Sequence, residues 1–402
     1  MIRNHRVRLA IAGAVLVLAA ASAAAAEAVR PEVGKPLKAA EALLKSGHAK
    51  EALAKVGEAD AVPNKTAYET FLVEELRGSA AHAAGELPTA VKSFETVVAS
   101  GRVSGREKLT FEQAIAVDYY KEKDYAKAAD WAQRYFKDGG TDPAMRTVLL
   151  QSYFLGNDCA AVARMVGGNG EEAGRKPSEE EFQILRSCYR KEKDDAGYVA
   201  ATERLIAFYP KKEYWAELLA RVQRKPGFAD RLSVNVYRLK LATGNLSGAD
   251  DYMEFAQLAL QAGIPAEAKS VMERGYDSGT LGRGDQAARQ GRLRDLVAKS
   301  LADSQRTRAQ DEQAALATRS GDDLVRIGLE EVYEGHGDKG LSFIQQGIHK
   351  GGLRHPEDAK LALGEAEIHA GHRTRAAQTL RTVHGNDGTA DLARLWILQA
   401  RS

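Results

Sequence analysis

The segment LALGEAEIHAGHRTRAAQTL, residues 361–380, aligns with the segment VRIGLEEVYEGHGDKGLSFI, residues 325–344, at a shift of 36 positions. Four residue types recur at matching positions, and the pairs are Gly328/Gly364, Glu331/Glu367, Gly335/Gly371 and His336/His372. In each segment the second glycine separates two stretches with the periodicity of a helix. Glycine easily adopts the left-handed backbone that ends a helix. The shared residues therefore predict two adjacent helix-turn-helix units rather than two copies of a catalytic motif.

The same turn recurs along the chain. Its predicted centres are Gly47, Gly85, Lys123, Asn157, Lys193, Gly227, Gly263, Gly335 and Gly371. Successive centres lie 34 to 38 residues apart, except for one gap of 72 residues after Gly263. That gap equals two units, so the spacing predicts a further interruption of the helix near Lys299. One such hairpin cannot bury its apolar face alone, whereas a stack of hairpins can.

Residue size around the turns favours close packing within each hairpin. Small residues stand five places after the turn at Ala52, Ala90, Ala128, Ala268, Gly340 and Ala376. Large apolar residues follow four places later at Phe94, Met272, Ile344 and Leu380.

Charged residues make up 28% of the chain and aromatic residues 7%, and alternating stretches rich in Val, Ile and Thr are scarce. This composition predicts an all-α protein.

The spacing resembles the tetratricopeptide repeat (TPR). The TPR pattern places Leu-Gly in the first helix, Gly at the turn and Ala in the second helix. The matching residues here are Leu363-Gly364, Gly371 and Ala376 in one unit, and Gly78, Gly85, Ala90 and Phe94 in another, with Pro210 at the inter-repeat position. The resemblance covers residues ~35–385. It implies a right-handed superhelical solenoid of about ten helix-turn-helix repeats.

The repeat pattern divides the chain into segments. Residues 27–280 are expected to form an N-terminal and central TPR-like array, and residues 281–320 a degenerate repeat or linking helices. Residues 321–402 are expected to form C-terminal repeats. Their last segment, GTADLARLWILQA, predicts a helix that caps the exposed edge of the stack.

Residues 1–26 have the pattern of a secretory signal peptide. Arg3, Arg6 and Arg8 precede an apolar core at residues 9–20, and a run of small residues ends at Ala26. The apolar run is short for a membrane span, which needs about 20 residues. We therefore expect an exported, periplasmic chain with no stable membrane insertion after cleavage.

The charge and motif content exclude several classes of function. Loss of the three N-terminal arginines lowers the formal net charge from +2 to about −1, which gives no electrostatic basis for binding nucleic acid. The sequence has no nucleophile elbow, HExxH pair, phosphate-binding glycine loop or CxxC pair, so we expect no enzyme activity, cofactor or metal.

One alternative is a metal-handling protein. Glu365, His369 and His372 have helical spacing suited to a divalent ion, although Gly371 is expected to end the helix before His372.

The two cysteines, Cys159 and Cys188, are predicted to form a disulfide. Cys159 opens the second helix of one unit, and Cys188 lies late in the first helix of the next. Consecutive helices run antiparallel, so these two ends face each other, and an exported chain meets an oxidising compartment. The alternative is a pair of separate buried thiols.

A basic stripe is the candidate binding feature. First helices line the concave side of a TPR stack, and the resemblance places on that side Tyr120, Lys121, Arg190, Lys191, Arg221, Arg224 and Lys225. Basic groups beside aromatic rings suit an extended acidic peptide or a terminal carboxylate. The alternative is that these residues only stabilise the negative ends of their helices and solubilise the surface.

The sequence thus predicts a non-enzymatic periplasmic scaffold for protein–protein interaction. The segments 209–222, 231–246 and 251–281 also resemble TPR proteins found beside TonB-type transport systems, which would imply an accessory role in uptake. A second alternative is a helical platform associated with an enzyme that acts on peptidoglycan or another envelope polymer.

Overall fold

A computed structural model describes residues 27–167 and 175–401, so the predicted signal peptide at residues 1–26 lies outside the described part. All regular structure in the described residues is helical. None of these helices is long and apolar enough to cross a bilayer. The chain divides into two compact units, Met1–Asp158 and Cys159–Ser402 (units 1 and 2). The predicted boundaries at residues 280 and 320 stay predictions.

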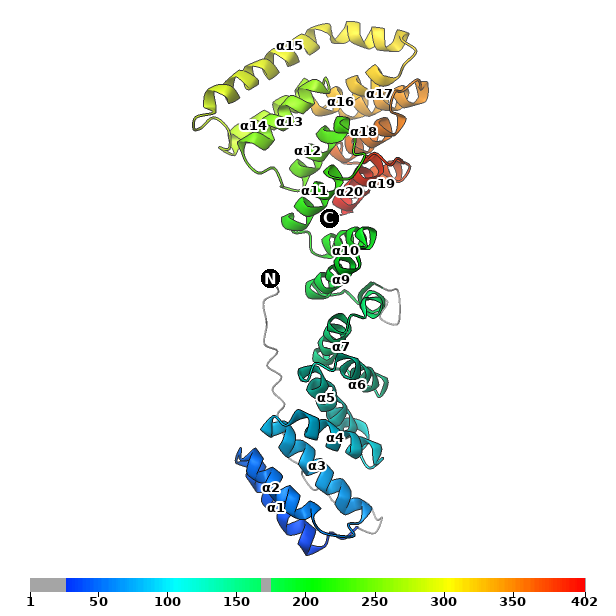
Figure 1. Cartoon of the computed structure of the whole chain (residues 1–402). Coiled ribbons are helices and arrows are strands. Elements are labelled where there is room, and N and C mark those ends of the chain that lie inside the picture. Colours follow the sequence, from blue (N-terminus) through cyan, green and yellow to red (C-terminus); the bar gives the residue numbers. More distant parts are fainter. Residues whose placement is uncertain (1–26, 168–174, 402) are drawn as a thin grey trace. The chain divides into compact units, whose positions relative to one another are not determined.

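Unit 1 is a series of antiparallel helix pairs with one further helix (Figure 1). Its helices are α1 (Pro31–Lys45), α2 (Ala49–Asp60), α3 (Ala67–Ala84), α4 (Leu87–Ala99), α5 (Gly105–Lys121), α6 (Tyr125–Lys137) and α7 (Pro143–Leu155). Consecutive helices pack on one another throughout the series, and the first helices α1 and α3, and likewise α5 and α7, are also in contact.

Unit 2 begins with a short helix and a π-helical turn, Ala163–Gly167. Its α-helices are α8 (Cys159–Val162), α9 (Glu179–Glu192), α10 (Asp195–Phe208), α11 (Lys212–Gln223), α12 (Ser233–Ala242), α13 (Ala249–Gln261), α14 (Pro265–Asp277), α15 (Ala287–Ala317), α16 (Asp322–Tyr333), α17 (Gly337–Lys350), α18 (Pro356–His369), α19 (Arg373–Leu380) and α20 (Thr389–Arg401). A 3-10 turn, Asp230–Leu232, precedes α12.

The predicted turns are confirmed by their backbone geometry. All nine predicted centres have positive φ angles, between 59° and 93°. Three of them are not glycines. Asn157 tolerates a left-handed backbone, but Lys123 and Lys193 do not favour it, so at these two turns the packing of the helix pair fixes the position.

The predicted close approach within a hairpin is also confirmed. In α16 and α17 a Cβ atom built on Gly328 would lie 2.5 Å from the carbonyl oxygen of Gly340 and 2.6 Å from the Ile344 side chain. In α18 and α19 the side chain of Leu380 fills the same place above Gly364. The chain is therefore an all-α, TPR-like solenoid of helix pairs, as the sequence predicts.

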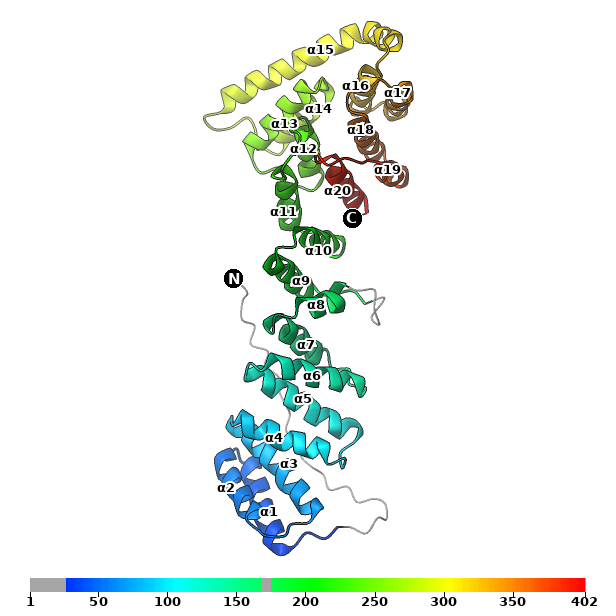
Figure 2. The same cartoon turned by 45° about the vertical axis from the view of Figure 1, so that its right-hand side comes forward.

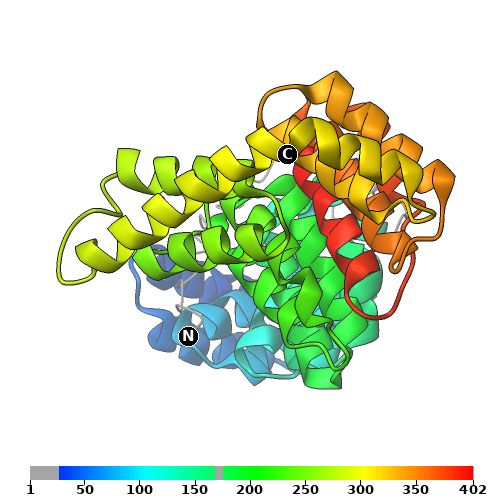
Figure 3. The same ribbon diagram turned by 90° about the horizontal axis from the view of Figure 1, so that it is seen from above.

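The predicted interruption near Lys299 is wrong. α15 is one unbroken helix of 31 residues (Figure 3). No glycine or proline stands near Lys299, and the buried residues Leu293 and Val297 lie one turn apart on the face that packs in unit 2. α15 packs on α13, α14 and α16, while α14 and α16 also contact each other directly. The stack therefore continues from α14 to α16, and α15 lies outside it.

The C-terminal helices fold back onto earlier helices of unit 2. One hydrophobic cluster joins Trp215 and Leu218 of α11 to Leu361 of α18 and to Leu392 and Trp396 of α20. α20 contacts α10 and α12 as well as α18 and α19, and it lies beside α11 in Figure 2. The predicted capping helix is confirmed as α20, and it covers central helices in addition to the last hairpin.

A buried polar cluster lies at the same junction. The Arg238 guanidinium on α12 donates to Glu267 on α14, with both N···O distances 2.7 Å, and to Glu365 on α18 at 2.8 Å. Glu365 also accepts hydrogen bonds from Asn235 at 3.0 Å and from the Trp396 indole at 2.6 Å. Four helices, α12, α14, α18 and α20, thus meet on one ion cluster.

The structure joins Cys159 at the start of α8 to Cys188 in α9 through a disulfide, with a Cα–Cα distance of 5.3 Å. The two cysteines are 29 residues apart in sequence, so the bond closes a loop of that length within unit 2.

We expect Gly328→Ala to lower the free energy of unfolding by about 1–3 kcal/mol, because the added methyl group enters the filled space between α16 and α17. The matched control is Gly291→Ala on α15, where a Cβ atom would meet no neighbour within 4 Å. That change should stabilise the protein by about 0.5–1 kcal/mol through helix propensity. Urea unfolding followed by circular dichroism measures both, and equal effects would contradict the packing described.

We expect the double change Cys159→Ser and Cys188→Ser to destabilise unit 2 by about 3 kcal/mol, because the unfolded chain loses a constraint on its loop. Dithiothreitol should lower the stability of the natural chain by a similar amount and leave the double variant unchanged. Alkylation of both thiols in the unreduced exported protein would show that the bond does not form.

Candidate functional site

The candidate site lies on the first helices of successive pairs. In unit 2, α9 and α11 are two such helices, and polar side chains connect them. Gln183 on α9 donates to the Tyr214 hydroxyl on α11 at 2.8 Å, and Tyr214 donates in turn to Glu179. Lys211 pairs with the same Glu179 at 2.7 Å. These contacts hold α9 and α11 in a fixed register.

A group of charged residues surrounds the Tyr198 ring where α10 meets these two helices. We call it the Tyr198 cluster, and it consists of Arg186, Arg190, Tyr198, Glu217 and Arg221. The guanidinium carbons of the three arginines lie 4.7, 5.3 and 4.3 Å from the centre of the Tyr198 ring, in the order of their numbers. The face of an aromatic ring attracts cations, so one buried tyrosine gathers three of them.

Hydrogen bonds fix the interior of the cluster. The Tyr198 hydroxyl donates to Glu217 and accepts from Arg190 at 3.0 Å and from Arg186. Arg186 also donates to Glu217, and its Nε is buried without a hydrogen-bond partner. Arg190 is exposed, and about a third of the Arg221 side chain is exposed. Two of the three cations are therefore accessible to a ligand.

The carboxylate at the centre of the cluster stays ionised. Burial alone would raise the pKa of Glu217, but hydrogen bonds from Tyr198 and Arg186 and the charges of Arg186 and Arg221 outweigh it and hold this pKa below its usual value. The only other acidic partner of the cluster among the described residues is Asp195, which bonds Arg221 at 3.0 Å and has a side chain 87% exposed. The cluster therefore keeps an excess of positive charge.

The structure brings together only part of the predicted stripe. Arg190 and Arg221 meet at Tyr198, and Arg224 lies exposed at the end of α11, one turn beyond Arg221. Lys191 is exposed beside Arg190. Lys225 instead forms an ion pair of 2.6 Å with Asp391 of α20, so it is occupied within the chain.

Tyr120 and Lys121 belong to unit 1 and have their own partners. The Tyr120 hydroxyl donates to Gln151 at 2.8 Å, and the ring lies edge-on to Tyr125. Lys121 lies 3.4 Å from Asp118, which is fully buried and also bonds His82 at 2.6 Å. These two residues are therefore separate from the Tyr198 cluster.

Sequence reasoning missed Arg186, Tyr198 and Glu217. A signal was present, because Arg186 precedes Arg190 by four residues and Glu217 precedes Arg221 by four, which places each pair on one helix face. Tyr198 had no such signal, since it comes from a second helix and reaches the cluster only through the packing of α10.

The histidine set proposed as an alternative metal site is not assembled. Glu365 is enclosed and already accepts hydrogen bonds from Arg238, Asn235 and Trp396. His369 is an exposed residue whose ring lies against Tyr333, with ring centres 4.8 Å apart, and desolvation on that side lowers its pKa. These contacts remove Glu365 from any ligand set with His369 and His372.

Glu331, Glu334 and His336 do lie close enough to hold an ion. However, Arg308 pairs with both carboxylates, at 2.7 Å for Glu334, and Lys339 lies 3.1 Å from Glu331. The two cations already neutralise this group.

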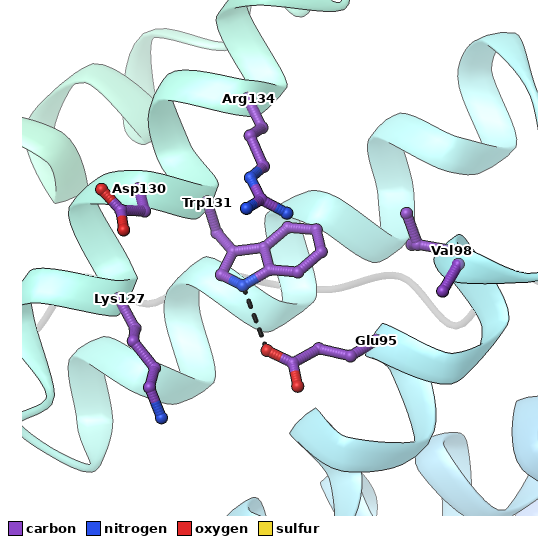
Figure 4. Close-up of a pocket in the computed structure, with 7 residues that line it drawn as sticks. Glu95, Val98, Lys127, Asp130, Trp131 and Arg134 are labelled. Atoms are coloured by element: carbon purple, nitrogen blue, oxygen red, sulfur yellow. Dashed lines mark hydrogen bonds between the residues drawn. The ribbon is translucent and has the colours of Figure 1, made fainter.

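A shallow pocket of about 400 Å³ lies between α4 and α6 in unit 1 (Figure 4). Trp131 lines it and donates from its indole nitrogen to Glu95 at 3.2 Å. The Arg134 guanidinium lies 4.5 Å from the centre of the indole. Its lining of Lys127, Asp130, Glu95 and Arg134 balances positive and negative charge, so the pocket has no electrostatic preference comparable to that of the Tyr198 cluster.

No protein-family model and no curated protein matches the chain. Among solved structures, the complex of Naa15/Naa10 bound to HypK-THB is similar at 15% identity and a TM-score of 0.39, over 87% of this chain and 58% of that one. The TPR domain of P58(IPK) is similar at 14% identity and a TM-score of 0.24, over 92% of this chain and 97% of that one. The chain thus spans less than two thirds of the first of these.

We expect Glu217→Gln to lower the free energy of unfolding by about 2 kcal/mol at pH 7, because it leaves the buried Arg186 without its carboxylate. The pKa of Glu217 is lowered in the folded state, so its contribution is present above the ordinary pKa of about 4.3 and is lost as the pH falls further. The deficit of the variant should therefore shrink below pH 4.

The matched control for this change is Asp195→Asn, which alters the same cluster at an exposed position and should change stability by less than about 0.5 kcal/mol. Chemical denaturation across pH 3–8 measures both variants. A deficit for Glu217→Gln that does not vary with pH would contradict an ionic role for this carboxylate.

Proposed function

We propose that this chain is a non-enzymatic scaffold that binds a protein partner along the first helices of unit 2. The Tyr198 cluster anchors an acidic segment or a terminal carboxylate of that partner. The observation that carries the proposal is the gathering of three guanidinium groups on one buried ring with a single carboxylate, the partly exposed Glu217, hydrogen-bonded at its centre.

The chemistry of the cluster favours an anionic ligand. Guanidinium groups present parallel N–H donors that match a carboxylate, and such charge-assisted hydrogen bonds are about twice as strong as neutral ones. Arg186 is fixed by Glu217 and Tyr198, while Arg190 and Arg221 keep exposed donors. The Tyr198 ring and the contacts between α9 and α11 already hold these arginines in place. Binding a ligand therefore costs little side-chain conformational entropy.

We place this activity in the periplasm, as an accessory to TonB-type uptake. The signal-peptide pattern of residues 1–26 and the pairing of Cys159 with Cys188 support export. The uptake role rests on the sequence resemblance of residues 209–281 alone. Identification of the envelope protein that carries the acidic segment would test both statements.

The defined test is fluorescence anisotropy with a labelled, glutamate-rich peptide that ends in a free carboxylate. We expect Arg190→Glu with Arg221→Glu to raise the Kd at least tenfold, since each lost charge-assisted contact is worth about 1.5–3 kcal/mol. Binding should also weaken with salt.

The control variant is Arg306→Glu, which makes the same kind of charge change on α15, where the side chain is 74% exposed and pairs with the nearby Asp303. It should leave the Kd within about twofold. Equal losses in both variants would mean that the peptide responds to net charge alone, and binding that survives the cluster variant would place the site elsewhere.

A further inference from the structure

The pocket between α4 and α6 in unit 1 holds two opposite charges that do not pair with each other. Glu95 of α4 and Arg134 of α6 both line it. Within residues 27–167 and 175–401, neither side chain has an oppositely charged group at ion-pair distance. Opposite charges that share one pocket attract each other even in water, so an arrangement that keeps them apart requires an explanation.

Two aromatic donors hold the Glu95 carboxylate in place. Tyr119 of α5 donates its hydroxyl to Glu95 Oε1 at 2.7 Å, and Trp131 of α6 donates its indole N–H to the same oxygen at 3.2 Å. Both aromatic side chains are buried. Burial and the neighbouring carboxylate raise the pKa of Tyr119, so its hydroxyl stays a donor. These neutral donors orient the carboxylate and leave its negative charge uncompensated.

Arg134 is fixed on the same indole. Its guanidinium carbon lies 4.5 Å from the centre of the Trp131 ring, where the face of an aromatic ring attracts a cation. Figure 4 shows the guanidinium over the ring and Glu95 at the indole N–H. Trp131 therefore positions both charges and holds them apart. Arg134 is exposed, so its donors remain open to a ligand.

The rest of the lining adds an apolar surface and a balanced rim. Val98 and Ala99 of α4 are the apolar members, and Lys127 and Asp130 of α6 add one charge of each sign. Lys127 is already engaged, since its ammonium group lies 3.4 Å from Asp124. The volume of about 400 Å³ is within the range of pockets that bind small molecules. The pocket thus presents a carboxylate, a guanidinium and an apolar wall.

We propose that this pocket binds a small zwitterion, a free α-amino acid with an aliphatic side chain. The ammonium group of the ligand pairs with Glu95, its carboxylate pairs with Arg134, and its side chain lies on Val98 and Ala99. A ligand with a single charge leaves one of the two pocket charges unpaired, so the site selects for both. The pocket lies on second helices of unit 1, so this function goes beyond the partner binding proposed for unit 2.

The test uses the full chain labelled with ¹⁵N-tryptophan and titrated with L-leucine. The chain has three tryptophans, and the indole N–H of Trp131 reports on the site because it bonds Glu95. Trp131→Phe assigns its NMR signal. L-Leucine should shift this signal and leave those of Trp215 and Trp396, both in unit 2, unchanged.

Two matched probes separate the charges of the ligand. N-acetyl-L-leucine lacks the cation, and L-leucinamide lacks the anion. Each should bind at least tenfold more weakly than L-leucine, because each loses one charge-assisted contact.

Two variants separate the charges of the pocket. Glu95→Gln keeps an oxygen for both aromatic donors and removes the charge, and Arg134→Gln removes the guanidinium. Each should raise the Kd for L-leucine at least tenfold. The controls are Glu58→Gln on α2 and Arg106→Gln on α5, which make the same changes at exposed positions outside the pocket. They should leave the Kd within about twofold.

Equal affinity for L-leucine and L-leucinamide would mean that the pocket recognises only a cation, and equal affinity for L-leucine and N-acetyl-L-leucine would mean that it recognises only an anion. Either result would overturn the proposal, and so would a Trp131 signal that L-leucine does not move. None of these results affects the acidic-peptide assay of unit 2, so failure of this site and failure of the proposed function are distinguishable.

Discussion

A desolvated guanidinium sets the arrangement of unit 2. The Arg238 side chain is only 5% exposed, and removing such a charge from water is tolerated only when its donors are paired. Its partners, Glu267 and Glu365, come from α14 and α18, and Trp396 of α20 completes the shell of Glu365. Separation of these helices would leave a buried charge uncompensated, at a general cost of about 3–5 kcal/mol. This ion cluster therefore holds α18 and α20 in their position against α10 to α12.

The local part of this architecture could be predicted from sequence because it repeats. Each first helix ends at a residue with a left-handed backbone, and a small residue follows where the second helix crosses the first. Gly335 with Gly340, and Gly371 with Ala376, are two examples of this pattern. The disulfide partners could also be placed, since antiparallel helices bring the start of α8 to the late part of α9. Each of these inferences needs only neighbouring units.

The remaining features depend on residues far apart in the sequence. Arg238 and Glu365 are 127 residues apart, and Lys225 and Asp391 are 166 apart, so no local periodicity pairs them. A basic residue at the end of α11 and a carboxylate near two histidines therefore suggest ligand sites that the fold has already filled. The unbroken helix α15 was not predicted for a related reason. A constant repeat length implies a break at Lys299, but no residue near this position disfavours a helix strongly enough to end it.

Structural charges differ from candidate binding charges in whether their partners lie inside the fold. Lys225, Glu365 and Glu69 have all their main partners inside the fold, and each one ties two or more helices together. Arg190 differs, since its side chain is exposed and keeps donors that a ligand can reach. Arg190 therefore remains available to a ligand, whereas the partners of Lys225, Glu365 and Glu69 are supplied by the fold itself.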